Sequence, residues 1–304
     1  MKKLFTLLAL TISFSMNAQM VDNSPNNNSA GIYSVAMGDG TSASGDASTA
    51  MGINTTASGM GSIAMGRSTT ASGDYSTAMG YQTTASGYYS TAMGYQTTSS
   101  GHYSTSMGRN TTASGQNSTT MGSGTIASGN NSTATGYFTT ASGNKTTAMG
   151  ANTTASDYAS LVIGQYNSSG SSVTNSATAY NTANTAFVIG NGVDSSNKSD
   201  AFKVMFNGDT TVGGDITISS DARLKSNIVS LGSTLSKLLL IDGKSYEKDG
   251  KQRIGVLAQE IQEVFPELVT EDGNEMLAVN YQGLVPVLIN ALKEQDEKIN
   301  RLEK

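Results

Sequence analysis

The chain has 304 residues, long enough for two domains, and contains 34 glycines but no cysteine or tryptophan. Only 13% of its residues are charged and its net charge is −5, so it lacks the basic surface that a nucleic-acid partner requires. One histidine, His102, and no cysteine exclude most zinc sites built from side chains, and we expect neither a metal nor a cofactor.

Residues 1–18 have the pattern of a secretory signal peptide. Lys2 and Lys3 precede an apolar run over residues 4–14, and small or polar residues follow up to Ala18, after which we expect cleavage. The run is shorter than the ~20 apolar residues of a membrane-spanning helix. A retained signal anchor is the alternative. No later segment of the sequence is apolar enough to cross a bilayer, so we expect a mature chain without a transmembrane segment, secreted or at the cell surface.

A linker over residues 19–31 leads into a region, residues 32–190, that repeats every 14 residues with the consensus S-T-A-M-G-x-x-T-T-A-S-G-x-x. Such a Gly/Ser-rich composition is also typical of disordered linkers. Disorder, however, does not require a glycine at the same phase in ten successive units. A fixed glycine phase indicates a backbone with positive φ or no room for a Cβ, and a short fixed period indicates a solenoid. Met-Gly pairs begin at Met37, Met51, Met65, Met79, Met93, Met107, Met121 and Met149, with Thr135 and Ile163 in the same register.

Each unit divides into two extended pieces, S-T-A-M and T-T-A-S, each followed by an expected glycine turn. Strand alternation places Ala78 and Met79 on opposite faces. Small residues suit a narrow interior, which leaves the methionines as an outer apolar stripe. Because such stripes normally mark an interface, we expect the stripe to be buried between chains of an oligomer. Ten coils at ~4.8 Å each would form a rod on the order of 50 Å long.

The unit S-x-A-M-G-x-x-T-x-A-S-G resembles the head repeats of YadA-type trimeric autotransporter adhesins, which carry Val/Ile-Gly where this chain has Met-Gly. The resemblance extends from about Ile32 to Gly164, with degenerate units reaching Gly190. It implies a left-handed parallel β-roll that assembles as a homotrimer. The sequence lacks the family's C-terminal membrane barrel, so the autotransporter mechanism is not expected.

Tyrosines recur at two variable turn positions of the repeat. Ladders of exposed rings suit sugars or proteins, so these tyrosines are a candidate face for a glycan or protein ligand on a cell or matrix surface. The alternative, which we favour on sequence alone, is that turn positions vary freely and the rings shield neighbouring backbone. Tyr75, Tyr89 and Tyr103 occupy one position, and Tyr81, Tyr95 and Tyr137 the other.

Residues 191–219 break the repeat and are interpreted as a neck. The alternating residues 201–206, the turn at Asn207-Gly208-Asp209 and residues 210–212 predict a hairpin. Beyond it the charge rises and the glycine content falls, so a second domain, residues 220–304, is expected to be small and α+β, ending in a helix.

Three ordered blocks of this domain resemble the intramolecular chaperone of phage endosialidases and tail spikes, also found in the myelin regulatory factor family. The first is S-D-A-R-L-K-S-N-I from Ser220, the second runs from Ile254 to Val269, and the third is Tyr281-x-x-Leu284. The resemblance implies self-cleavage with Ser220 as nucleophile and Lys225 as general base, between Ser219 and Ser220.

That chemistry is physically coherent, because a hydroxyl needs a base to become nucleophilic, and a lysine can serve only where desolvation lowers its pKa. The resemblance implies that trimerisation supplies this partly buried setting. Asp221 and Arg223 are interpreted as turn or ion-pair residues, and Asn227 as a further motif position. Gln259 and Glu260 are interpreted as holding the fold or its subunit contacts.

The C-terminal segment has the 3-4 spacing of a coiled coil, and we expect a short one rather than an amphipathic helix packed only on its own domain. The seam positions are Val285, Leu288, Leu292, Gln295, Ile299 and Leu302.

The sequence therefore favours a secreted, trimeric, adhesin-like fibre whose last domain is an assembly chaperone and a single-turnover serine peptidase with no external substrate. The alternatives are a phage or prophage tail fibre that binds a receptor, or a depolymerase. The signal peptide argues against the first, and the lack of paired carboxylates in the repeats argues against the second.

Overall fold

The computed structural model describes residues 20–21, 27–248 and 250–303. These residues fall into two compact units, one ending at Thr217 and the other beginning at Ile218. The signal peptide expected at residues 1–18 lies outside the described residues. Among the helices that are described, none is long and apolar enough to cross a bilayer.

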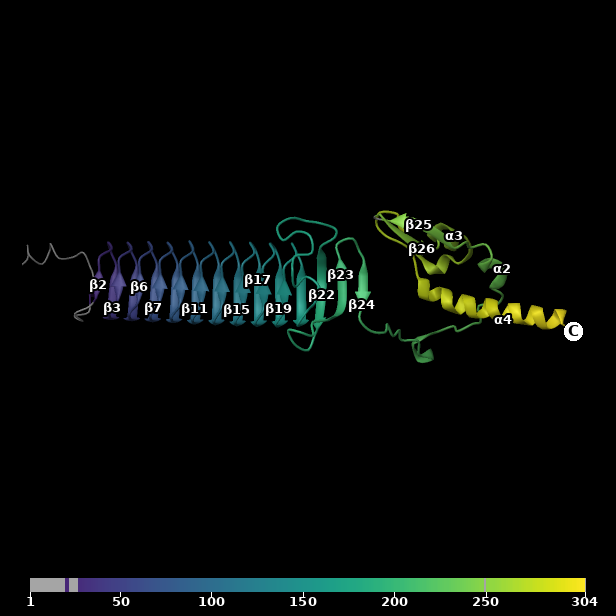
Figure 1. Ribbon diagram of the computed structural model, residues 1–304, viewed down its shortest axis with the longest axis horizontal. Helices are drawn as coiled ribbons and strands as arrows, with labels where there is room; N and C mark the ends of the chain where they lie inside the picture. Colours follow the sequence, from purple (N-terminus) through teal and green to yellow (C-terminus); the bar gives the residue numbers. More distant parts are fainter. Residues whose placement is uncertain (1–19, 22–26, 249, 304) are drawn as a thin grey trace, which may run out of the picture. The chain divides into compact units, whose positions relative to one another are not determined.

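The first unit is a parallel β-solenoid of about ten coils, as the repeat predicts (Figure 1). Most coils contain one five-residue strand and one two-residue strand. The long strands form one sheet, which begins with β1 (Met20–Val21), and the short strands form a second. The long strands are β3 (Val35–Asp39), β5 (Thr49–Ile53), β7 (Ile63–Arg67), β9 (Thr77–Tyr81), β11 (Thr91–Tyr95), β13 (Thr105–Arg109), β15 (Thr119–Ser123), β17 (Thr133–Tyr137), β19 (Thr147–Ala151) and β21 (Leu161–Gln165). The short strands are β2 (Asn28–Ser29), β4 (Ser42–Ala43), β6 (Thr56–Ala57), β8 (Thr70–Ala71), β10 (Thr84–Ala85), β12 (Thr98–Ser99), β14 (Thr112–Ala113), β16 (Ile126–Ala127), β18 (Thr140–Ala141) and β20 (Thr154–Ala155).

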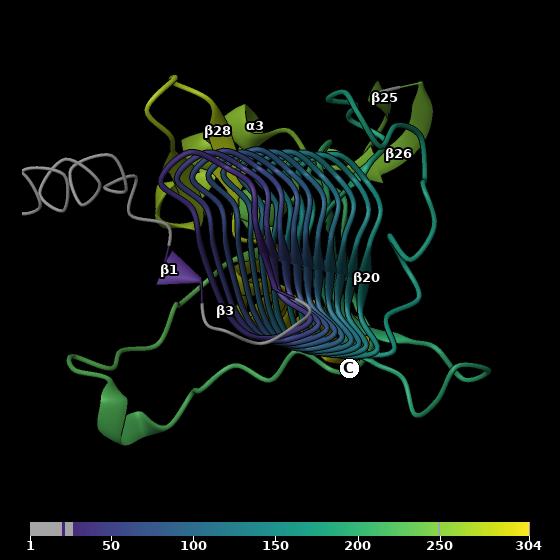
Figure 2. The same ribbon diagram turned by 90° about the vertical axis from the view of Figure 1, so that its left-hand side faces the viewer.

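Successive coils stack in register, so equivalent residues form ladders along the axis (Figure 2). Met79 pairs with Met93, and Ala78 with Ala92. Small side chains fill the interior, where Ala78 and Ala92 are fully buried. Serine in the interior can satisfy its hydroxyl locally, since Ser104 donates to the carbonyl of Gly101 at 2.6 Å. The methionines lie on the outer face of the long-strand sheet, half-buried or exposed, as alternation predicts.

Both recurring glycines are required because the next coil lies too close for a Cβ, and the first also has a positive φ. Gly94, in a Met-Gly pair, has φ +128° within strand β11, and a Cβ there would lie 2.1 Å from the Gly108 carbonyl oxygen. Gly87, in a Ser-Gly pair, would place a Cβ 2.1 Å from the Gly101 carbonyl oxygen. A side chain at either position would therefore collide with the backbone of the next coil.

The expectation of a glycine turn after the first extended piece is wrong. The Met-Gly glycine lies inside the long strand, and the turn after it has its own residue in the left-handed conformation. In most coils this residue is not glycine, as with Asn54 (φ 52°) and Gln82 (φ 51°), whereas Gly40 and Gly124 occupy the position in two coils. Asparagine tolerates this conformation better than most residues. The other turn also contains a left-handed residue, which is not glycine in most coils, for example Tyr75 or Asn117, and is Gly61 in one coil.

The last coil differs from the others. Strand β22 (Thr185–Asn191) pairs with β21 so that Ile189 lies opposite Ile163, a spacing of 26 residues instead of 14. The twelve extra residues form a loop before β22. Strands β23 (Asp200–Met205) and β24 (Thr210–Val212) then add antiparallel to the long-strand sheet. The hairpin assigned to a separate neck is thus part of that sheet, because β23 satisfies the edge of β22.

The second unit is small and contains α2 (Leu235–Leu238), α3 (Ala258–Val264), α4 (Leu284–Leu302) and two hairpins. Its buried centre is formed by Ile261, Phe265 and Val287. The Tyr281 hydroxyl accepts the Val256 backbone N–H at 3.3 Å, and a Cβ at residue 255 would lie 2.7 Å from that hydroxyl, so a side chain there would displace the ring. The remaining elements are η1 (Ala222–Leu224), β25 (Lys244–Lys248), β26 (Lys251–Gly255), η2 (Pro266–Leu268), β27 (Val269–Glu271), β28 (Leu277–Val279) and η3 (Tyr281–Gly283).

Candidate functional site

Ser220 and Lys225 lie together at the start of the second unit. The Lys225 Nζ is 2.7 Å from the Ser220 Oγ, within hydrogen-bond distance. The short helix η1 lies between them, and the Lys225 amide donates to the Ala222 carbonyl at 3.1 Å. This turn folds the chain back over five residues, so the lysine side chain reaches the serine.

Asp221 organises the same turn. Its carboxylate accepts the Arg223 backbone N–H at 2.9 Å, and it forms an ion pair with the Arg223 guanidinium at 2.7 Å. The hydrogen bond from the Arg223 side chain, followed by that from its backbone, lowers the pKa of Asp221. Asp221 and Arg223 thus form a turn and an ion pair, and neither contacts the Ser220 hydroxyl.

The pair is exposed in the single chain. Ser219, Ser220 and Lys225 all face solvent, and so do the residues around them from 211 to 233. A lysine amine becomes neutral near pH 7 only where water is excluded from it. The hydrogen-bond geometry of a serine–lysine pair is therefore present, whereas the desolvation that the chemistry needs is not supplied by this chain alone.

The other motif residues lie outside that contact. Asn227 adopts the left-handed conformation with φ 53° and is exposed. Glu260, on α3, accepts the Asp242 backbone N–H at 3.1 Å and lies 3.3 Å from the Lys244 Nζ, so it fastens α3 to the loop before β25. Gln259 is exposed on the same helix.

Large apolar side chains are left uncovered around the pair and along α4. Near the pair, the exposed fractions of Leu224, Ile228 and Val229 are 74%, 67% and 83%. On α4, Val287 and Ala291 are buried against the unit itself, but the predicted seam faces solvent. Its exposed apolar members are Val285, Leu288, Leu292, Ile299 and Leu302.

The repeat tyrosines form two ladders at opposite ends of the long strands. Tyr75, Tyr89 and Tyr103 precede their strands and stack with ring centroids 4.9 and 5.6 Å apart. Tyr81 and Tyr95 end theirs and stack at 5.2 Å.

Neighbouring groups extend both ladders. The guanidinium of Arg67 lies over the Tyr81 ring, and that of Arg109 over the Tyr95 ring. Tyr137, in contrast, packs edge-on against Phe138.

Tyr88 is a member of the first ladder that the sequence reasoning missed. Its ring lies edge-on to Tyr75, Tyr89 and Tyr103. Its pKa is raised, first by the hydrogen bond with Tyr89 and then by partial burial. The sequence carries a signal for it, because Tyr88 directly precedes Tyr89 in the same turn.

Comparison with known families bears out both resemblances. Residues 29–139 and 141–167 match the YadA head domain repeat in overlapping pairs of units, and residues 220–270 match the chaperone of endosialidase (Peptidase_S74). The chain therefore contains a solenoid similar to YadA head repeats, followed by a segment similar to the chaperone of endosialidase.

Curated relatives come from bacteriophages. The long tail fiber protein Gp37 of Enterobacteria phage K3 is 36% identical over 100 residues, which is 29% of this chain and 8% of that protein. Gp37 of Enterobacteria phage T2 gives the same values. Gp37 of Enterobacteria phage M1 is 30% identical over 101 residues, 29% of this chain and 40% of that protein. The matched part of the chain thus spans less than half of the length of these relatives, from 8% to 40%.

Proposed function

We propose that the chain is the subunit of an exported homotrimeric fibre whose last domain directs assembly and then cuts itself from the fibre between Ser219 and Ser220. One observation carries the proposal: the Lys225 Nζ lies 2.7 Å from the Ser220 Oγ on a segment whose apolar side chains lack cover within their own chain. The matches to an adhesin head repeat and to an assembly chaperone domain support the two parts of the fibre.

The cleavage step uses only groups of this chain and water. The neutral Lys225 amine takes the proton of the Ser220 hydroxyl, and the oxygen attacks the carbonyl carbon of Ser219. The C–N bond between the two residues breaks, and the lysine returns the proton to the released Ser220 amine. Water then hydrolyses the resulting ester, which leaves a carboxylate on Ser219 and restores the Ser220 hydroxyl. Nucleophile and target are chain neighbours, so no substrate pocket is needed.

Assembly supplies the missing desolvation. Leu224, Ile228 and Val229 flank the pair, and burying them against other copies would exclude water from Lys225 as well. The unpaired seam of α4 provides the means of bringing three copies together. Cleavage then takes place only in a correctly assembled fibre.

The solenoid is proposed as the shaft and adhesive part of this fibre. The methionine stripe on the long-strand sheet suits burial between chains, because it is apolar and in register from coil to coil. The tyrosine ladders at the turns are exposed and remain available to a glycan or protein ligand on a cell or matrix surface. Their mutual stacking uses the ring faces, which favours ligands that contact edges and hydroxyls.

The similarity to long tail fibres favours a second candidate, a prophage or phage receptor-binding fibre. The two candidates differ in export. An exported adhesin would be processed after Ala18 and found outside the intact producing cell, whereas a virion fibre would stay inside the cell until lysis.

The cleavage proposal is tested by expressing the full chain and resolving its products on a denaturing gel, with mass spectrometry of the fragments. The wild-type chain should give a fragment that begins at Ser220. Ser220→Ala and Lys225→Met should each give one uncut band while still forming trimers, because both side chains are exposed and support no core contact. Ser226→Ala, a serine next to Lys225 in the same motif, is the matched control and should be cut like the wild type. An unchanged fragment from Ser220→Ala would overturn the pair.

A further inference from the structure

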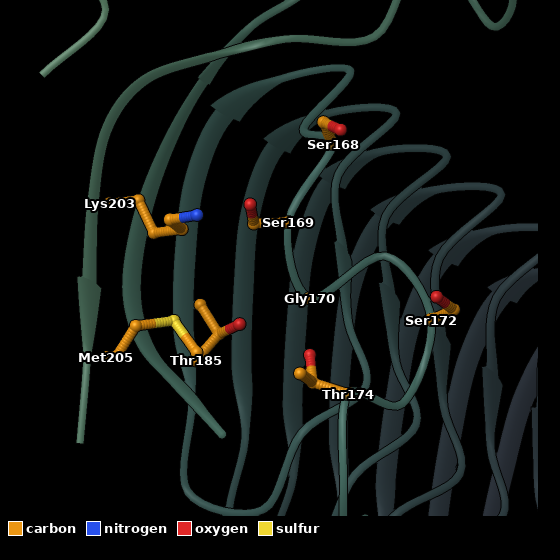
Figure 3. A pocket seen from close by; sticks show the side chains of 8 residues that line it. All are labelled: Ser168, Ser169, Gly170, Ser172, Thr174, Thr185, Lys203 and Met205. Atoms are coloured by element: carbon orange, nitrogen blue, oxygen red, sulfur yellow. The ribbon is translucent and has the colours of Figure 1, made fainter. Parts of the chain in front are cut away.

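The solenoid ends in a polar pocket of about 350 Å³, closed on one side by the loop inserted before β22. We propose that this pocket binds an acidic sugar, a hexuronic acid unit of a glycan, with the Lys203 ammonium holding the carboxylate. Figure 3 shows the Lys203 side chain extending from β23 toward Ser169 and the strand that carries Thr185. The pocket lies wholly in the first unit, so it does not depend on self-cleavage.

The inserted loop is held firmly, which makes the pocket preformed. The buried Asn167 side chain accepts the Thr154 N–H at 2.8 Å and donates to the Thr154 carbonyl at 2.9 Å, in the manner of an added strand. The buried Asp157 carboxylate accepts from the Thr174 N–H, the Thr174 hydroxyl and the Thr185 N–H. Asp200 accepts from Ser168 and Ser169 N–H, both at 2.9 Å.

The charged groups around the pocket are the Lys203 ammonium and the carboxylates of Asp157 and Asp200, and no ion pair joins Lys203 to either carboxylate. Asp157 and Asp200 are occupied by N–H and O–H donors, and within the described part of the chain Lys203 has no ion pair or hydrogen bond. Lys203 is only half-exposed and pairs across the strands with Val188, a residue of the buried interior. A partly buried ammonium without a counter-ion favours an anionic ligand.

The other residues that line the pocket indicate which kind of anion would bind there. Ser168, Ser169, Ser172 and Thr185 line the pocket, their hydroxyls have no hydrogen-bond partner among the described residues, and Met205 adds an apolar wall. A hexuronic acid matches this set, because it carries one carboxylate, a ring of hydroxyls and apolar C–H groups. A phosphate fits less well, since it is recognised by clusters of backbone N–H groups, and those of Ser168, Ser169 and Thr174 are already donated to carboxylates. The volume lies near the lower end of the range for small-ligand pockets.

The test measures binding of D-glucuronic acid and D-glucose to the purified full-length fibre by titration calorimetry and saturation-transfer NMR. The two probes differ only in whether C6 is a carboxylate. We expect saturable binding of glucuronic acid that is at least about tenfold tighter than that of glucose, as expected for one charge-assisted hydrogen bond. Glucuronic acid that fails to bind, or equal binding of both sugars, would overturn the proposal.

Variants locate the site. Lys203→Met should remove the preference for glucuronic acid, and Lys203→Arg should keep it. Lys198→Met, a change to an exposed lysine outside the pocket lining, is the matched control and should bind like the wild type. Ser169→Ala leaves the backbone contact to Asp200 intact and should weaken both sugars while keeping the preference. If Lys203→Met folds poorly, Lys203→Arg and Ser169→Ala still test the proposal. The proposal is contradicted if both variants lose the preference for glucuronic acid over glucose, or if neither variant changes the affinity for either sugar.

Discussion

The two units reach stability in different ways. In the solenoid, every coil covers the next, and interior residues such as Ala78 and Ala92 are fully buried within one chain. In the C-terminal unit, three residues, Ile261, Phe265 and Val287, form the buried apolar centre, and many of its apolar side chains face solvent. The contrast teaches that the solenoid buries its interior within one chain, whereas the C-terminal unit leaves apolar surface that the proposed assembly would cover.

The largest effect of a substitution is expected on α4, where the predicted seam leaves a row of apolar side chains exposed. Leu292 has an exposed fraction of 70% in the single chain, so Leu292→Asp should cost the monomer little. In a trimeric coiled coil the same change buries three carboxylates, which costs several kcal/mol in total and should abolish assembly. Sedimentation velocity would measure the oligomer, and the denaturing gel should show loss of cleavage.

Lys293→Asp is the control for this variant, because residue 293 neighbours the seam position on the same helix but is not one of the spaced apolar positions. It should remain trimeric and be cut. If Leu292→Asp remained a trimer as well, α4 would not form the interface.

The next effect tests the solenoid by itself. Gly94→Ala places a methyl group 2.1 Å from a backbone oxygen of the next coil at φ +128°, and neither backbone can move without disturbing the register. We expect a loss of about 3 kcal/mol or more in the free energy of unfolding, measured by thermal and denaturant melts followed by circular dichroism. Gly214→Ala, at a glycine with nothing within 4 Å of the added atom, should be nearly neutral. A Gly94→Ala chain as stable as Gly214→Ala would contradict the packing of the coils.

Those glycines also explain what the sequence could predict. In a solenoid the same steric clash excludes every residue other than glycine at one position of each coil. Glycine therefore recurs at that position in ten coils, and the period becomes visible in the sequence. The left-handed turns were not predictable, because Asn54, Gln82 and Tyr75 differ in type, and their φ values are imposed by the coils on either side. The twelve extra residues before β22 also interrupt the 14-residue period, so the sequence alone does not show that β22 forms the next coil.

The residues of the candidate site could be predicted from the sequence, but the exposure of these residues could not. Ser220 and Lys225 come from a motif, and Asp221, as a turn-forming residue, is consistent with the turn that joins them. Their exposure could not be predicted from the motif, because burial depends on which segments pack over the turn, and residues 211–233 are all exposed in this chain. The pocket at Lys203 could not be found from the sequence, because it depends on β23 pairing with β22 across a loop.

A smaller effect concerns the joint between α2 and α4. The Glu294 carboxylate accepts from the Ser233 hydroxyl and from the backbone N–H groups of Thr234 and Leu235. The Ser233 bond, followed by the Thr234 bond, lowers the pKa of Glu294. A carboxylate with a lowered folded pKa stabilises the fold above its unfolded pKa, about 4.3, and loses that stabilisation as the pH falls through the folded value.

The unfolding temperature of the wild-type C-terminal unit should therefore fall on acidification below about pH 4.3, and that of Glu294→Gln should fall less. Differential scanning calorimetry of the full chain from neutral to acidic pH would measure this. Glu297→Gln, a change to an exposed carboxylate whose ion pair with Arg301 is 3.8 Å long, is the control and should follow the wild type. Identical pH profiles for Glu294→Gln and the wild type would show that the hydrogen bonds to the Glu294 carboxylate do not stabilise the joint between α2 and α4.

The smallest effect concerns the tyrosine ladder, which decides whether the turns of the solenoid contribute to its stability or only to its surface. Tyr89 stacks on Tyr75 and Tyr103 and contacts Tyr88 edge-on, so Tyr89→Ala removes three ring contacts. At about 0.5–1.5 kcal/mol for an aromatic pair, partly offset by solvent exposure, we expect a loss of about 1–2 kcal/mol in the free energy of unfolding. Tyr33→Ala, at an equivalent left-handed turn position with an exposed fraction of 72%, should cost much less. Equal losses in the two variants would mean that the rings do not stabilise the coils, and the ladder would then be free to serve a ligand alone.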